Sequence, residues 1–90
     1  MRVRWSLPAR ADLYRIYIHI AQSNPDAARM VIEALTTGCD DLISLSQRGR
    51  HSRIRGRREL VFQSLPYIAV YRVMKDMVEI SRVFHSAQDW

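Results

Sequence analysis

The sequence contains little cysteine, almost no lysine and no long apolar stretch. Cys39 is the only cysteine among 90 residues, so no disulfide can form within the chain, and a reducing compartment is expected. No apolar run approaches the roughly 20 residues that a membrane span needs, and no secretory signal pattern opens the sequence. His19 and His51 lack Cys or His neighbours at metal-binding spacing, and phosphate-binding loops and nucleophile elbows are missing. We therefore expect a cytoplasmic protein with no membrane segment, no metal and no cofactor.

Arginine supplies nearly all of the positive charge. The chain has 14 basic and 9 acidic residues, a formal net charge of +5, and Lys75 as its single lysine. A GC-rich genome would raise arginine throughout the chain but would not cluster it. Six arginines fall close together: Arg48, Arg50, Arg53, Arg55, Arg57 and Arg58. Because neighbouring cations repel one another, this cluster indicates a binding surface for an acidic partner, with an inert solvated loop as the alternative.

The periodicity of apolar residues predicts one domain, residues 1–90, of the α+β class. A strand is expected at 2–5. Ser6 can cap a first helix with Pro8 in its first turn, and Asn24 can cap a second that begins at Pro25 and extends to about Leu42. On the first helix the buried stripe is expected to include Ala9, Leu13, Ile16, Tyr17 and Ile20, with Arg10, Asp12, Arg15 and His19 largely off that face.

The second half of the chain predicts a loop at 46–57 and strands at 59–63, 67–73 and 77–85. The element order is therefore β-α-α-β-β-β. Short turns make the consecutive strands antiparallel, and an antiparallel helical hairpin should pack on one face of a small, mostly antiparallel sheet. The last strand should lie in the body of that sheet, because it carries several apolar residues.

Three further residues are candidate site residues. Glu59 can neutralise a nearby arginine or act as a general base. His85 can transfer protons near neutral pH, but strand alternation separates it from Arg82 unless a bulge intervenes, and a structural role bonded to backbone is the alternative. Trp90 is either packed against the sheet or exposed as a contact residue.

Several stretches, in their order and spacing, resemble the RelE/ParE superfamily of toxins from bacterial type II toxin–antitoxin modules. They are ADLYRIYIHIA at 11–21, NPDAA at 24–28, RRELV at 57–61, LPYIAVYRV at 65–73 and VEISRVFHSAQDW at 78–90. The resemblance covers nearly the whole chain. It implies a cognate antitoxin that binds the toxin in a hetero-oligomeric complex and brings it to operator DNA, which the toxin does not contact by itself.

The resemblance leaves two activities to choose between. RelE-like members are ribosome-dependent mRNA endonucleases, whereas ParE-like members inhibit DNA gyrase. The nuclease branch carries an arginine after the aromatic residue that opens its central strand, and the matching position here is Ile68. Because an apolar side chain cannot stabilise a charged transition state, the ParE-like branch is favoured.

The two activities predict different site residues. For a gyrase inhibitor, the expected partner-binding residues are Arg48, Arg50, Arg53, Arg55, Arg57, Arg58 and Trp90. For the nuclease alternative, acting on ribosome and mRNA, His85 or Glu59 would transfer protons while Arg58, Arg72 or Arg82 holds the phosphate.

Overall fold

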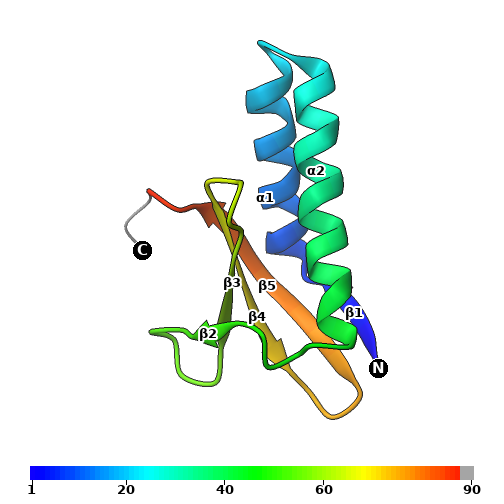
Figure 1. The fold of residues 1–90 in the computed structure, drawn as a ribbon, viewed down its shortest axis with the longest axis vertical. Coiled ribbons are helices and arrows are strands. Elements are labelled where there is room, and N and C mark those ends of the chain that lie inside the picture. The colour runs from blue at the N-terminus through cyan, green and yellow to red at the C-terminus, as the bar shows by residue number, and fades with distance from the viewer. Residues whose placement is uncertain (88–90) are drawn as a thin grey trace.

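The computed structural model describes residues 1–87 of the chain. Its elements are β1 (Arg2–Trp5), α1 (Leu7–Ala21), α2 (Pro25–Asp40), a 3-10 turn η1 (Asp41–Ile43), β2 (Arg50–His51), β3 (Arg58–Val61), β4 (Tyr67–Val73) and β5 (Met77–His85). The two helices run side by side as a hairpin that packs against the sheet at one end and projects past it at the other (Figure 1). The α+β prediction is confirmed, with β2 as an additional strand.

The sheet joins the two ends of the chain. Its order is β1-β5-β4-β3-β2; β1 runs parallel to β5, and the other neighbours are antiparallel. The prediction that the last strand lies in the body of the sheet is correct, since β5 has β1 on one side and β4 on the other. Val70 pairs with Arg82 but Tyr71 pairs with Ile80, so Ser81 is an extra residue that forms a β-bulge in β5.

Both helices begin where the caps predict. The Ser6 hydroxyl accepts a hydrogen bond from the backbone N–H of Ala9 at 3.2 Å, and the Asn24 side-chain oxygen accepts one from Ala27 at 3.1 Å. A proline follows each cap in the first turn, where its missing N–H leaves no hydrogen bond unmade. These two caps fix the start of α1 beside β1 and the reversal between the helices.

The core lies between the helical hairpin and one face of the sheet. Its fully buried side chains include Leu35 and Cys39 from α2, Leu42 from η1 and Tyr71 from β4. Burial, with Asp40 as a smaller cause, raises the pKa of the Cys39 thiol to about 12. Cys39 therefore stays protonated at neutral pH and acts as a small apolar packing residue.

Two predicted boundaries differ from the structure. β3 begins at Arg58 and ends at Val61, not at 59–63, because the turn into β4 already starts at Phe62, whose N–H donates to the Tyr67 carbonyl. The predicted loop contains the two-residue strand β2, whose polar residues show no apolar alternation.

In the described part of the chain, 1–87, no helix is long and apolar enough to cross a membrane.

Candidate partner-binding site

The basic loop, residues 46–57, is fixed at its base by a buried tyrosine from β4. The Tyr71 hydroxyl donates to the Ser46 carbonyl and accepts from the Gly49 N–H, each at 2.8 Å. Tyr71 is fully buried, and this burial is the main reason that its pKa is raised. The hydroxyl therefore keeps the proton that it donates, and the start of the loop is held against the core.

Gly49 has no room for a side chain. A Cβ atom there would lie 2.5 Å from the Tyr71 hydroxyl and 2.7 Å from the Glu59 carbonyl oxygen. The Gly49 carbonyl in turn accepts a hydrogen bond of 2.7 Å from the guanidinium of Arg58. The close approach of the backbone to Tyr71 therefore requires glycine and places the loop beside β3.

Tyr71→Phe should lower the free energy of unfolding by about 2 kcal/mol, because it leaves a buried N–H and a carbonyl without their partner. Urea denaturation of both proteins measures the change. Tyr14→Phe is the matched control, since Tyr14 is 68% exposed and makes no hydrogen bond through its hydroxyl within residues 1–87. Equal stability of the Tyr71→Phe variant and the wild-type protein would contradict the role given to this hydroxyl.

The arginines of the cluster differ in what their side chains contact. Arg50 pairs with Glu59 at 3.0 Å, so of the two roles considered for Glu59 the structure shows the ion pair. Within residues 1–87, the side chains of Arg48, Arg55 and Arg57 form no hydrogen bond or ion pair. The loop thus presents unneutralised guanidinium groups from a fixed base.

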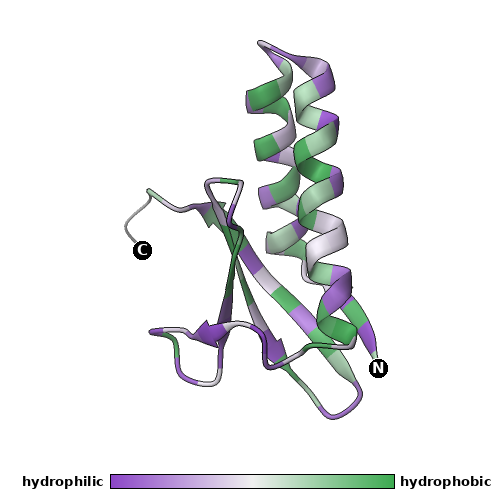
Figure 2. Ribbon diagram, viewed as in Figure 1, coloured by the Kyte–Doolittle hydropathy of each residue, from purple (hydrophilic) through white to green (hydrophobic). Residues whose placement is uncertain are grey.

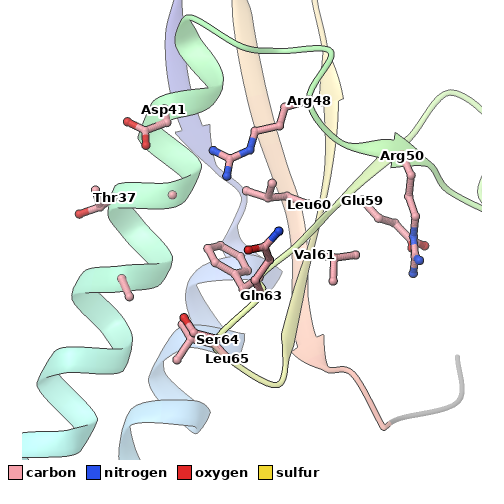
Figure 3. A pocket seen from close by; sticks show the side chains of 13 residues that line it. Thr37, Asp41, Arg48, Arg50, Glu59, Leu60, Val61, Gln63, Ser64 and Leu65 are labelled. Atoms are coloured by element: carbon pink, nitrogen blue, oxygen red, sulfur yellow. The ribbon is translucent and has the colours of Figure 1, made fainter.

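A groove of about 600 Å³ runs between the end of α2 and β3, beside the basic loop. Figure 3 shows Thr37 and Asp41 on its helical side and Arg48 reaching from the loop toward Leu60. β2 pairs only with the first two residues of β3, so in the described chain no strand lies beside the outer edge of Leu60 and Val61. An extended or helical segment with negative charge could contact this groove and the loop together.

A second polar cluster joins α1 to β5. Asp12 is 3% exposed and accepts hydrogen bonds from Arg82, Nε to Oδ2 at 2.8 Å and Nη2 to Oδ1 at 3.0 Å. It also accepts from the Val83 N–H at 2.9 Å and pairs with Arg15. The hydrogen bond and charge of Asp12 raise the pKa of Arg82.

The prediction from the sequence that Asp12 lies largely off the buried face of the first helix was therefore wrong. The β-bulge at Ser81 changes the alternation of β5, and Asp12 satisfies the Val83 N–H and Arg82 beyond it. The one sequence signal was that Asp12 is the only acidic residue in a helix whose other charged side chains are basic.

The bulge lies before both Arg82 and His85, so regular alternation still separates these two residues along β5. Both nevertheless line one cavity of about 300 Å³ between α1 and β5, together with Tyr67 and His19. The His85 ring meets Tyr67 edge to face, with ring centroids 5.5 Å apart, and its Nδ1 accepts from the Ala87 N–H at 3.1 Å. This hydrogen bond places His85 against backbone, as its structural interpretation expects.

The residues named for the nuclease alternative lie in different places. Glu59 and Ile68 line a cavity on the sheet that does not include His85, while His85 and Arg82 line the cavity beside α1. Arg72 pairs with Glu79 at 3.0 Å.

Trp90, which was expected to bind a partner, lies outside the described residues. Within residues 1–87, no group of three His, Cys, Asp or Glu side chains could hold a metal ion.

The chain is similar in sequence to a protein named as a putative toxin and in structure to chains of solved toxin–antitoxin systems. A curated relative named "Putative toxin Y4kP", from Sinorhizobium fredii, is 42% identical over 89 residues, which cover 99% of this chain and 92% of the relative. The solved chromosomal ParDE system from P. aeruginosa contains a chain with a TM-score of 0.84 and 27% identity, covering 94% of this chain and 95% of that one.

A second solved structure shares the fold at lower identity. It belongs to the toxin–antitoxin complex RelBE2 from Mycobacterium tuberculosis, with a TM-score of 0.69 and 22% identity over 97% of this chain and 92% of that one. The family model described as ParE toxin of type II toxin-antitoxin system, parDE, matches residues 3–90. The resemblance seen in the sequence is confirmed: the chain belongs to the ParE toxin family of type II toxin–antitoxin systems.

Proposed function

We propose that this ParE-family toxin acts in the cytoplasm, as one domain of residues 1–90, by inhibiting DNA gyrase until a cognate antitoxin neutralises it. The observation that carries the proposal is the basic loop, in which Arg48, Arg55 and Arg57 stay unpaired within residues 1–87 while Tyr71 fixes the loop base. Because the loop backbone is already held at its base, it loses less conformational entropy on binding, and its unpaired positive charges favour an acidic partner.

The positions of the residues named for the nuclease alternative also favour binding over RNA cleavage. Cleavage of RNA needs an acid or base and a cation on one phosphate, within hydrogen-bond reach of each other. Here Glu59 is neutralised by Arg50, and the position after Tyr67 is the buried Ile68. His85 lines another cavity together with Arg82, but the Arg82 guanidinium is held there by Asp12. The chain is thus better suited to binding than to cleavage, and it would reach operator DNA through the antitoxin.

The purified chain, freed of antitoxin, tests this function in two parallel reactions. One contains gyrase, ATP and supercoiled plasmid, and the other contains translating ribosomes with message. We expect linearised plasmid in the first reaction and intact message in the second. Codon-phased cleavage of the message with normal gyrase activity would overturn the proposal and favour the nuclease branch.

Arg55→Ser together with Arg57→Ser should weaken gyrase inhibition at least tenfold while changing the free energy of unfolding by less than about 0.5 kcal/mol. The reason is that neither side chain has an ionic partner among residues 1–87. Dose–response curves for plasmid linearisation measure the loss. Arg2→Ser with Lys75→Ser is the matched control, because it removes the same charge from exposed positions outside the loop. Equal losses in the two variants would show that total charge, not the loop, determines inhibition.

A further inference from the structure

Helix α1 is apolar on two opposite sides. Its inner side packs on the core through Ala9, Leu13 and Ile16. Its outer side carries a second set at i, i+4, i+7 and i+11, which we call the outer stripe: Leu7, Ala11, Tyr14 and Ile18. Residues at this spacing share one helix face, so these side chains form a continuous row.

The outer stripe is exposed in the described chain. Leu7 is 77%, Tyr14 68% and Ile18 40% exposed, and Ala11 is exposed as well. A hollow of about 420 Å³ lies along the stripe, bounded by Tyr14, Ile18 and the polar residues beside them. Figure 2 shows hydrophobic residues at intervals along the whole of α1, including the part that projects beyond the sheet. An aligned apolar row of this kind is typical of an interaction surface, unlike single exposed apolar residues.

The charges around the outer stripe are positive. Arg10 and Arg15 flank it on either side by their positions in the helix, and His19 lies one turn beyond Arg15. Asp12, the only acidic residue of α1, is buried under Arg82. A second copy of α1 would bring arginine against arginine, which opposes self-association, whereas an acidic helix would complement these charges.

The cavity between α1 and β5 continues this basic surface. Arg15 and His19 line both the hollow beside the stripe and the cavity that contains Arg82 and His85. Arg82 holds Asp12 through Nε and Nη2, and no acceptor within residues 1–87 contacts its Nη1, which can therefore bind a further carboxylate. With two arginines against one carboxylate, the cavity keeps a net positive charge, and its volume of about 300 Å³ admits an acidic side chain.

We propose that the outer face of α1 binds an acidic amphipathic helix from a partner protein. The apolar side of that helix covers Leu7, Tyr14 and Ile18, and an acidic side chain enters the cavity between Arg15 and Arg82. The 15 residues of α1 span about 22 Å, enough for roughly four turns of the partner helix. This surface is separate from the basic loop, and the inference holds whether or not gyrase is the target.

Two helical peptides of about 18 residues test the proposal by fluorescence anisotropy with the purified chain. Both have leucine in a continuous stripe; one carries glutamate at the flanking positions and the other lysine. We expect the glutamate peptide to bind and the lysine peptide not to bind. Tyr14→Glu with Ile18→Glu should weaken binding at least tenfold, and raising the salt concentration should weaken binding to the wild-type protein.

Two single variants are the matched controls. Met30→Glu changes an apolar residue of α2 that is 69% exposed, and Arg55→Glu reverses a charge in the basic loop. Neither should affect binding of the glutamate peptide. The proposal is overturned if that peptide does not bind the folded wild-type protein, or if Arg55→Glu reduces binding as much as the α1 variant does. It is also overturned if sedimentation equilibrium shows a dimer that the α1 variant dissociates, because the occupant is then a second copy.

Discussion

Asp12→Ala should lower the free energy of unfolding by about 2–3 kcal/mol, because it leaves the buried Val83 N–H without an acceptor and removes the partner of the half-exposed Arg82. The Asp12 carboxylate accepts from the Val83 N–H and twice from Arg82. Its loss leaves an N–H of the strand β5 without an acceptor near the core and opens the contact between α1 and β5. For a chain of this size, the melting temperature should fall by roughly 8–24 °C.

Thermal and urea denaturation followed by circular dichroism measure this change. Asp26→Ala is the matched control, since Asp26 pairs with Arg29 on the surface of α2 and should cost no more than about 1 kcal/mol. Asp12→Asn should fall between the two, because its amide oxygen can still accept from Val83. A loss after Asp12→Ala as small as the control's would show that the cluster contributes little to stability.

Gly49→Ala should destabilise the protein by about 3 kcal/mol, at the upper end of the range for overpacking. The added methyl group would meet the Tyr71 hydroxyl and the Glu59 carbonyl oxygen, neither of which lies at the end of a flexible chain. To make room, the start of the basic loop must move away from Tyr71. Gyrase inhibition should therefore fall together with stability, as the loop arginines lose their fixed base.

Gly56→Ala separates this clash from the general cost of replacing a loop glycine. Gly56 has a φ of +78°, but no atom lies within 4 Å of an added Cβ. Its replacement should cost about 1 kcal/mol through backbone strain alone. Urea denaturation gives both values, and a Gly49→Ala variant no less stable than Gly56→Ala would contradict the close packing at Tyr71.

Local sequence signals were sufficient to predict most of the fold. Capping by Ser6 and Asn24 depends on residues three positions away, and the bounds of β4 and β5 follow from apolar runs that end at turns. The position of β5 inside the sheet also followed from its apolar content. The clustering of arginines predicted the basic loop.

Features that depend on distant partners could not be predicted in this way. The bulge at Ser81 is a property of how β5 pairs with β4, and Asp12 is buried where it accepts hydrogen bonds from Val83 and Arg82 of β5. The β2 strand exists because Arg50 pairs with Glu59 and Tyr71 holds the loop beside β3. The sequence shows the isolated negative charge of Asp12 and the arginines near Glu59, but it does not show which distant residues these side chains contact.

The parallel pairing of β1 with β5 has a consequence for the synthesis of this toxin. Residues 2–5 find their strand partner only in residues 77–80, and the hydrogen bond from Ser6 to Ser81 joins positions 75 apart. On the ribosome, the helical hairpin can form early, but β1 has no strand to pair with until residues 77–80 have emerged. The sheet therefore closes late, and until then the two helices have no complete surface on which to pack.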